Sequence, residues 1–341
     1  MMRTSRRPAI VPAAATLLFL IAGCTDSQPV VSATPPAVKP IAQQPPPPPL
    51  VHPLTADMTS IGQNATYVVQ PNDTLLDVAR KYDLGYTQLM TANHGLDPWA
   101  PQAGKPVKLP AHYLLPEVPR TGIVINLPQH RLFYFPPGGK SVQTFPIGTA
   151  VQGWPTPLGV TKVARKELNP VWHVPRSIRA ENPDLPAQIG PGPDNPLGDR
   201  AMPLGWSGYL IHSTNKPYGI GRNVSHGCIH LYPEDMEWLY TEVSVGTPVR
   251  VINQEVVSAW LDGALYIAVF PNTKQAEFID LNQPMPFATP PHLHEIVEKA
   301  ARRHPGKIDW QAVDTAARER SGMPVRVTAP SGGAAEQTAL F

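Results

Sequence analysis

The most informative stretch of this chain is Ser225-His226-Gly227-Cys228-Ile229-His230, with His212-Ser213-Thr214 upstream. It places a cysteine with one histidine two positions away on each side. If the segment is a strand, side chains 226, 228 and 230 project from one face, because successive side chains alternate between faces. A nearby imidazolium favours the thiolate, the nucleophilic form of cysteine. The segment therefore predicts a cysteine whose reactivity is set by histidine.

The spacing of these residues leaves three interpretations open. In the first, a histidine activates Cys228 against a carbonyl group, and Gly227 lets backbone N–H groups approach the developing oxyanion. In the second, Cys228 with His212, His226 and His230 supplies four ligands for zinc. In the third, Cys228 is buried and inert, since free cysteine packs as a small hydrophobic residue.

Short β-prone runs surround this segment between residues 121 and 253, and Gly and Pro punctuate nearly every gap. Residues 182–197 are rich in Pro, Gly, Asn and Asp and predict a long surface loop that covers a site. Pro233-Glu234-Asp235 predicts the start of a helix. With 44 prolines in 341 residues, an all-helical fold is disfavoured. The predicted strands are 122–127, 131–135, 143–147, 209–212, 228–231 and 247–252.

Residues 66–110 predict a small β-α-α-β unit upstream of this region. A strand at Tyr67-Val68-Val69 precedes a helix whose N-terminus carries a capping box formed by Thr74 and Asp77. A second helix is predicted over 86–93 and a closing strand over 107–109. Downstream, residues 254–325 predict an α/β extension with a hairpin around Asp262-Gly263 and helices near 292–303 and 310–318. Residues 326–341 are predicted to be a disordered tail.

The first 24 residues predict an export signal. Arg3, Arg6 and Arg7 precede an apolar run over 9–22, which is too short for a permanent membrane span. Ile21-Ala22-Gly23-Cys24 resembles a bacterial lipobox, which implies that Cys24 carries lipid and that the protein lies in the periplasm. Thr25 then favours the outer membrane over the inner one. Residues 25–65, rich in proline, predict an extended linker.

Charge argues against nucleic acid as a partner. The chain has 28 basic and 26 acidic residues, and three of the basic ones lie in the predicted signal. No basic stripe interleaved with aromatic residues is present in the sequence. Of the two cysteines, Cys24 is assigned to lipid, which leaves Cys228 without a disulfide partner.

The unit at 66–110 resembles a LysM module, a family that binds the N-acetylated sugar chains of peptidoglycan or chitin. Asn72 stands where the family often has glycine, and a generic two-helix packing unit is the alternative. The resemblance rests on Tyr67-Val68-Val69, Asp73-Thr74-Leu75, Ala79, Tyr82, Leu89, Asn93, Gly104 and Leu109-Pro110.

Residues 121–253 resemble the L,D-transpeptidase (YkuD-type) catalytic family. The family motif is a histidine, about fifteen intervening residues, and then Ser or Thr-His-Gly-Cys. Here fifteen residues separate His212 from Cys228, and Ser225-His226-Gly227-Cys228 matches in full. The turn at 155–159 and the segment 245–249 add to the match. The implied fold is a β-sandwich-like domain of mixed sheets, so the whole chain is expected to be mainly β with minor α.

This resemblance implies a mechanism on peptidoglycan stem peptides. Cys228 would attack the carbonyl of a diaminopimelate residue, expel the terminal D-alanine and form a thioester. His212 would be the general base, oriented by the backbone carbonyl of Ser213. Gly227 and Cys228 amides would form the oxyanion hole, and His226 would transfer protons or support the site. No cofactor or metal is expected.

Substrate contacts are assigned to Ser225 and His230, and His230 stands where the family usually has Arg or Asn. An amine on a second stem peptide or on a wall-attached lipoprotein would accept the acyl group, whereas water would make the protein a carboxypeptidase. The expected partners are thus glycan strands, stem peptides and, through the lipid, a membrane. The alternative from a different class is a non-catalytic LysM tether.

Overall fold

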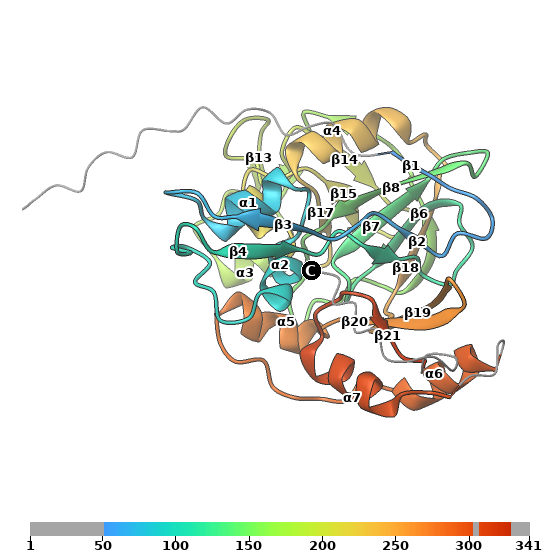
Figure 1. Cartoon of the computed structure of the whole chain (residues 1–341). Coiled ribbons are helices and arrows are strands. Elements are labelled where there is room, and N and C mark those ends of the chain that lie inside the picture. Colours follow the sequence, from blue (N-terminus) through green and yellow to red (C-terminus); the bar gives the residue numbers. More distant parts are fainter. Residues whose placement is uncertain (1–50, 303–306, 329–341) are drawn as a thin grey trace, which may run out of the picture. The chain divides into compact units, whose positions relative to one another are not determined.

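The computed structural model describes residues 51–302 and 307–328 (Figure 1). The predicted signal with Cys24, most of the predicted linker and nearly all of the predicted tail lie outside these residues. Strands outnumber helices, as expected for a mainly β chain with minor α. Among the described residues, no helix has the length and apolar character needed to cross a membrane.

A six-stranded mixed sheet forms the first layer of the cysteine-bearing region. Its order is β1-β8-β7-β6-β18-β10, and only the β6–β18 pair is parallel. Every residue of β7 is buried and β6 is buried from its second residue onward, which explains their nearly continuous apolar sequences. The strands are β1 (His52–Pro53), β6 (Gly122–Asn126), β7 (Arg131–Phe135), β8 (Ser141–Pro146), β10 (Gly159–Lys162) and β18 (Pro248–Ile252).

A four-stranded sheet, β11-β14-β15-β17, shares one hydrophobic core with the first sheet. Ile123, Leu132 and Phe145 from the six-stranded sheet belong to the same buried cluster as Ile211 and Ile229. Helix α4 (Pro233–Glu242) begins at the predicted proline and adds Met236 and Leu239 to this core. The strands are β11 (Glu167–Leu168), β14 (Arg200–Pro203), β15 (Leu210–His212) and β17 (Ile229–His230).

The six strands predicted from sequence are all present, with ends that differ by one or two residues. The predicted surface loop at 182–197 is not wholly irregular, because β13 (Gln188–Ile189) pairs with β12 (Trp172–His173). Helix α3 (Arg176–Glu181) precedes this loop and buries no residue. Its sequence therefore has no apolar periodicity from which a helix could be predicted. Two further short strands, β9 (Thr149–Ala150) and β16 (Asn223–Ser225), pair in parallel, and a single 3-10 turn covers Pro217–Gly219.

The small upstream unit runs β3 (Ala65–Val68), α1 (Leu75–Lys81), α2 (Tyr86–Ala92) and β4 (Pro106–Leu109), with β3 and β4 antiparallel. The Thr74 hydroxyl accepts a hydrogen bond from the Asp77 N–H at 3.1 Å and so caps α1. The prediction that the linker extends to residue 65 is wrong, because residues before 65 already form paired strands. β1 pairs with β8, and β2 (Ser60–Ile61) pairs with β5 (Tyr113–Leu114).

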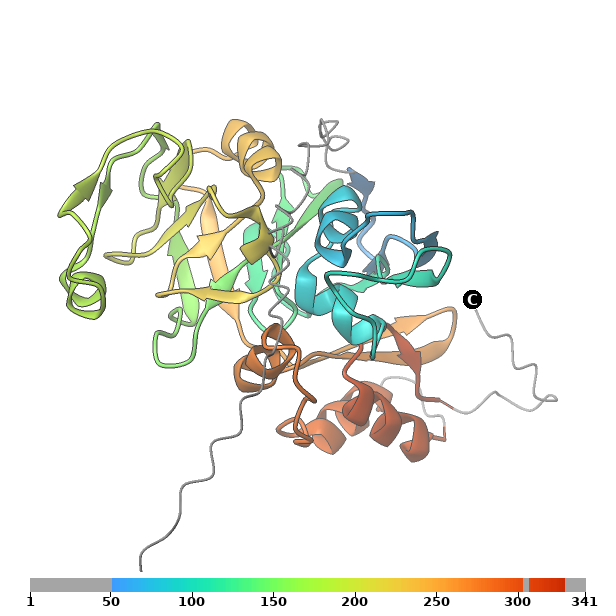
Figure 2. The ribbon, with the colours of Figure 1, turned by 90° about the vertical axis from the view of Figure 1, so that its left-hand side faces the viewer.

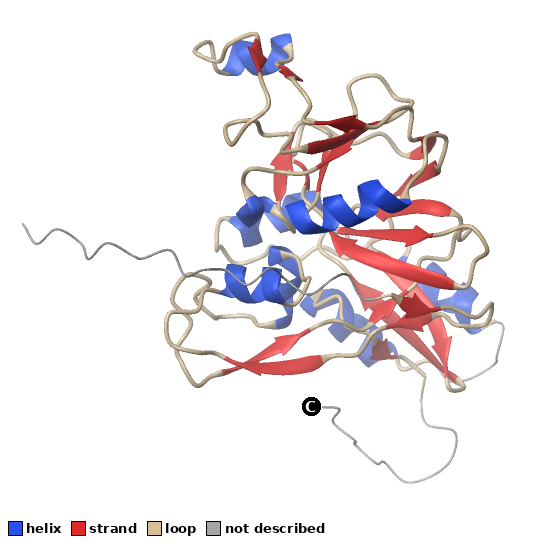
Figure 3. Cartoon of the chain, turned by 90° about the horizontal axis from the view of Figure 1, so that it is seen from above, coloured by secondary structure: helices blue, strands red, loops and turns tan. Residues whose placement is uncertain are grey.

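The C-terminal region packs a three-stranded sheet against helices (Figure 2). Figure 3 shows the strands and helices of the described residues from above. Strands β19 (Val256–Leu261) and β20 (Ala264–Val269) form the predicted hairpin, and β20 also pairs with β21 (Val325–Arg326). Helices α6 (Leu293–Ala301) and α7 (Trp310–Glu319) lie where the sequence predicts them, whereas α5 (Thr273–Asp280) was not predicted. The tail boundary at 326 is wrong, since β21 includes Arg326, and Val327 and Thr328 are buried.

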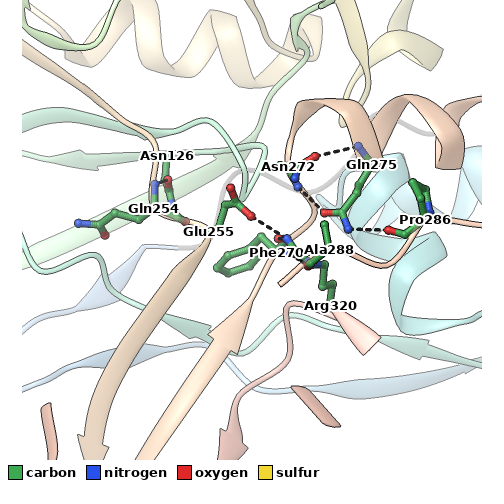
Figure 4. A network of polar contacts seen from close by, with 9 residues as sticks. All are labelled: Asn126, Gln254, Glu255, Phe270, Asn272, Gln275, Pro286, Ala288 and Arg320. Atoms are coloured by element: carbon green, nitrogen blue, oxygen red, sulfur yellow. Dashed lines mark hydrogen bonds and ion pairs between the residues drawn. The ribbon is translucent and has the colours of Figure 1, made fainter. Parts of the chain in front are cut away.

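A buried arginine joins the end of α7 to the strands of this region (Figure 4). Arg320 is 1% exposed and forms an ion pair with Glu255 at 2.8 Å. It also donates to the carbonyl oxygens of Phe270 and Ala288. Nearby, Asn272 and Gln275 form a capping box at the start of α5. This network fixes where α5 leaves β20.

A second buried arginine joins the small upstream unit to the six-stranded sheet. Arg131 on β7 is fully buried, donates to the Asp83 carbonyl at 2.9 Å and to Gln88 at 3.0 Å, and lies over the Tyr113 ring. At the surface of the same junction, Arg80 forms a two-pronged ion pair with Glu234 at 2.8 Å. These contacts attach the small unit to the sheet by charge as well as by apolar packing.

Two carboxyl groups face each other in this junction. Asp83 Oδ1 and Asp235 Oδ2 are buried without a hydrogen-bond partner, so a proton bound to one carboxyl group would let it donate to the other. Burial raises the pKa of Asp83 to about 7 against the pull of Arg131, and burial together with the charge of Asp83 raises the pKa of Asp235 well above its usual value.

We expect Asp235→Asn to change how stability depends on pH. Because the folded pKa values lie above the unfolded ones, the wild type loses stability as pH rises from about 4 through 7. The amide N–H of the variant can donate to the ionised Asp83 carboxylate, so neither group has to bind an extra proton. The free energy of unfolding of the variant should therefore exceed that of the wild type by about 1–2 kcal/mol at pH 8. Urea denaturation at pH 5 and pH 8 measures this, with the exposed Glu242→Gln on the same helix as control. Parallel pH curves for all three proteins would contradict the shared proton.

Candidate active site

Parallel pairing of β15 with β17 brings the two halves of the predicted motif together. Ile211 pairs with Ile229 and His212 pairs with His230. The imidazole rings of His212 and His230 therefore lie on one face, with centroids 4.3 Å apart. Cys228 directly precedes β17, two residue pairs along from the histidines and therefore toward the same face, with its thiol beside the Leu210 backbone N–H. The register thus gathers His212, Cys228 and His230.

The tautomer of His212 follows from its neighbour. Its Nδ1 lies 2.6 Å from the backbone carbonyl of Ser213, which can only accept, so Nδ1 carries the proton and Nε2 keeps its lone pair. The side chain is 2% exposed. Burial lowers the pKa of His212 to about 4, although the carbonyls of Ser213 and Leu197 oppose the shift. At neutral pH this ring is an uncharged base.

The thiol of Cys228 is in its neutral form in the same environment. Its Sγ lies 3.8 Å from the Gly208 carbonyl oxygen, toward which the S–H points. Burial raises the pKa of Cys228, and the Leu210 N–H opposes this only in part. The sequence predicted a thiolate stabilised by an imidazolium. The structure instead holds a thiol near neutral imidazoles, because burial penalises both charged forms.

His230 packs against the His212 ring and is half-buried. Its backbone N–H donates to the Gly148 carbonyl at 3.0 Å, and its carbonyl accepts from the Gly148 N–H at 2.9 Å. Burial, together with any charge on His212, holds the pKa of His230 well below its usual value. His230 therefore adds an uncharged ring beside His212, where an arginine would add a permanent charge.

His226 lies apart from this pair and faces other residues. Its Nε2 is 3.0 Å from a Glu181 carboxylate oxygen on α3, and its ring meets Trp154 edge-on with centroids 4.8 Å apart. In residues 51–302 and 307–328, no group of three or more His, Cys, Asp or Glu side chains could hold a metal ion. The four residues considered as zinc ligands are thus not brought together as a set.

The backbone between His226 and Cys228 is shaped by the Tyr209 ring and by three hydrogen bonds. Gly227 has φ +111°, and a Cβ there would lie 2.6 Å from the Tyr209 ring. The Thr156 hydroxyl donates to the Gly227 carbonyl at 2.9 Å, and the Ser225 hydroxyl donates to the Cys228 carbonyl at 2.7 Å. The Gly227 N–H donates to Ser225 Oγ at 3.2 Å. Of the two predicted oxyanion-hole amides, that of Gly227 is therefore already hydrogen-bonded, and Ser225 holds the loop by its side chain.

Four residues of this site were not singled out from sequence: Thr156, Glu181, Tyr209 and, as a site residue, Trp154. Thr156 lies in the turn at 155–159, which contributed to the family resemblance as a whole. Tyr209 is close to His212 along the chain, but nothing in the sequence shows that its ring fills the space where a Cβ on Gly227 would lie. Glu181 lies on α3, which carries no sequence signal of its own.

Comparisons with known proteins agree with the two resemblances drawn from the motifs. The model of the L,D-transpeptidase catalytic domain (YkuD) matches residues 120–251, and that of the LysM domain matches residues 67–110. The protein named probable L,D-transpeptidase YcfS of Escherichia coli is 38% identical over 279 residues, which are 78% of this chain and 84% of the relative. Probable L,D-transpeptidase YbiS of the same organism is 35% identical over 289 residues, 82% of this chain and 92% of the relative. Probable L,D-transpeptidase ErfK/SrfK of Salmonella typhimurium is 36% identical over 279 residues, 79% of this chain and 88% of the relative.

We expect Gly227→Ala to disturb this loop more than its backbone strain alone would. The variant combines an unfavourable positive φ with a clash against Tyr209, so the free energy of unfolding should fall by more than about 1–3 kcal/mol. Gly138→Ala is the matched control, because Gly138 has φ +97° and open space where a Cβ would lie. Urea denaturation of both variants separates the two contributions. Equal losses would mean that the Tyr209 contact does not constrain the loop.

Proposed function

The chain belongs to the YkuD-type L,D-transpeptidase family, and we propose that this enzyme uses Cys228 as the nucleophile that cleaves the diaminopimelate–D-alanine bond of a peptidoglycan tetrapeptide stem. The observation that carries this proposal is the β15–β17 register, which groups the thiol with a neutral imidazole whose Nδ1 is tied to Ser213. His212 is the general base. Its other nitrogen, Nε2, keeps its lone pair and can take up a proton.

In the first half of the reaction, the thiol proton passes to His212 Nε2 as sulfur bonds to the diaminopimelate carbonyl carbon. Because burial favours the neutral forms of both groups, the proton is expected to move together with bond formation. The carbonyl oxygen becomes an oxyanion beside the Cys228 N–H, and Gly227 N–H would join once released from Ser225. The C–N bond then breaks, and His212 returns the proton to the departing D-alanine amine.

In the second half, an acceptor amine resolves the thioester. The amine loses a proton to His212, bonds to the acyl carbon and releases the Cys228 thiol, which recovers that proton. The energy of one amide bond is thus carried through the thioester to another. We propose an amine acceptor, either a second stem peptide, giving a 3-3 cross-link, or a lipoprotein lysine. Hydrolysis by water is the competing outcome.

The remaining site residues act on the substrate or on the loop. Ser225 supports the Cys228 backbone through its hydroxyl. We propose that His226, which contacts Glu181 and Trp154, supports the wall of the site, with proton transfer as its alternative role. His230 would contact the substrate only beside the His212 ring, and without a guanidinium it offers no two-pronged grip on a carboxylate.

The LysM domain supports glycan strands of peptidoglycan as the second binding partner. We further propose that Cys24 carries the lipid and that the enzyme works in the periplasm, attached to the outer membrane in preference to the inner one. The basic start, the short apolar run and the Ile21-Ala22-Gly23-Cys24 sequence support this location.

Replacing the nucleophile should abolish chemistry and leave binding intact. Purified native protein and Cys228→Ala are incubated with tetrapeptide muropeptides, and D-alanine release and cross-linked mass are measured. We expect turnover by the native protein only, and a drop of at least about a thousandfold for His212→Ala. Sacculus binding should be equal in all three proteins. Equal product from native and Cys228→Ala protein would refute Cys228 as the nucleophile, while D-alanine release without cross-linked mass would identify water as the acceptor.

Lipid attachment is tested separately in intact cells. We expect the full chain to incorporate labelled fatty acid and to fractionate with the outer membrane, because several acyl chains on one cysteine hold it there. Cys24→Ser should remove both the label and the membrane fractionation. Unlabelled native protein in the soluble periplasmic fraction would contradict the lipid anchor.

A further inference from the structure

The segment that leads into the reactive loop is built into two other parts of the molecule. We call residues 220–225 the loop root, because β16 ends at Ser225, directly before His226 and Cys228. Its contacts decide where the thiol lies relative to His212. They come from α2 of the LysM region and from α5 of the C-terminal region, which lie next to each other (Figures 1 and 2).

Helix α5 holds the loop root through four hydrogen bonds. One Asp280 carboxylate oxygen accepts from the Asn223 N–H at 3.0 Å and the other from Arg222 Nε at 3.3 Å. The Asp280 carbonyl accepts from Arg222 Nη2 at 2.6 Å, and the Thr273 carbonyl accepts from the Asn223 amide at 2.9 Å. Both ends of α5 thus contact two consecutive residues of the root.

Helix α2 holds the same root from its other end. The N–H groups of Tyr86 and Thr87 donate to the carbonyls of Ile220 and Gly221 at 3.2 and 3.1 Å. The Tyr86 ring lies 4.6 Å from the Arg222 guanidinium carbon. A Cβ on Gly221 would lie 2.1 Å from the Tyr86 nitrogen, so the two backbones touch. Arg222 is therefore enclosed by Tyr86 and Asp280.

The side chain of Asn223 completes the support from inside the domain. Its Oδ1 accepts from the Thr149 hydroxyl at 2.7 Å and lies 3.0 Å from His130 Nε2. Asn223 is 7% exposed, and the Asp280 side chain is only 11% exposed. Since these groups are shielded from water, losing one partner would leave the others unsatisfied. Asn223 thus links Asp280 on α5, through its backbone N–H, to Thr149 on β9, through its side chain.

Helix α5 also grips the opposite side of the site. Glu277 Oε1 accepts from the Gln152 N–H at 2.7 Å, two residues before Trp154, whose ring packs on His226. One helix turn of α5 therefore touches both segments that flank His226. No residue of α5 belongs to the motif that defines the family match at 120–251.

We propose that Asp280 is a positioning residue, which holds the loop carrying Cys228 in its reactive place through Arg222 and the backbone of Asn223. The proposal rests on the proposed role of Cys228 and adds a part of the chain outside the matched catalytic domain. Burial raises the pKa of Asp280 to about 6, while the Asn223 N–H and the Arg222 charge oppose the shift, so the carboxylate remains ionised at neutral pH. The ion pair with Arg222 is thus present where the enzyme is expected to work.

The test separates positioning from stability by two readouts on the full chain. The first is the kcat and KM for D-alanine release, with kcat normalised to folded protein. The second is the rate at which iodoacetamide alkylates Cys228, which needs no substrate. For Asp280→Ala we expect kcat to fall between about tenfold and a hundredfold, with KM within about twofold of the wild type and a changed alkylation rate. Asp280→Asn keeps one oxygen for the Asn223 N–H but turns an amide NH2 toward Arg222, so it should restore only part of the loss.

Glu295→Gln is the matched control, because it removes a carboxylate from an exposed ion pair on α6 in the same C-terminal region. It should leave both readouts unchanged. If Asp280→Ala does not fold, Arg222→Met decides, since it keeps an apolar side chain of similar length beside Tyr86 and removes every guanidinium bond to Asp280. A folded Asp280→Ala or Arg222→Met protein with wild-type kcat and alkylation rate would overturn the proposal. If wild-type protein releases no D-alanine, the proposed function fails, and the alkylation rates still decide positioning.

Discussion

The parallel pairing of two short strands, β15 and β17, is the constraint on which the active site depends. Only three and two residues long, they align His212 with His230 and leave Cys228 at the entrance of the second strand. A slip of one residue would turn these side chains to the opposite face. The surrounding structure prevents the slip. The Leu231 N–H donates to the His212 carbonyl, and the backbone N–H and carbonyl of Gly148 both bond to the backbone of His230. Ile211 and Ile229 are fully buried in the common core.

Burial then determines the charge state of the site. His212, His230 and Cys228 are each held in the neutral form because the interior penalises imidazolium and thiolate alike. A neutral imidazole with its Nδ1 proton committed to Ser213 is suited to accept a proton. A permanently charged guanidinium at position 230 would repel that proton from the adjacent ring. His230 therefore leaves His212 able to act as a base even though burial lowers the pKa of His212.

Much of this arrangement could be predicted from sequence, and the limits have physical causes. The fifteen-residue spacing between His212 and Cys228, the Pro233 helix start and the Asp262-Gly263 turn depend on local chemistry, and each is read directly from neighbouring residues. Helix α5 was not predicted, and its role comes from partners far away in the chain: Asp280 meets Arg222, and Glu277 meets Gln152. Burial of Arg131 and Arg320 was likewise hidden, because arginine in a sequence usually indicates an exposed position. The neutral thiol could not be predicted either, since it depends on desolvation by the complete fold.

The buried arginine and paired carboxyl groups at the junction between the LysM region and the six-stranded sheet have a mechanical consequence. Because Arg131 and Arg80 bond across that junction, the glycan-recognition unit does not swing freely on a hinge. With Cys228 as the proposed nucleophile and a sugar chain bound to the LysM region, these contacts would hold the distance between that chain and the sulfur constant. Such an enzyme would select stem peptides by their spacing along the glycan strand as well as by their chemistry. A LysM module moved to another protein would keep this distance only if the residues at the junction were moved with it.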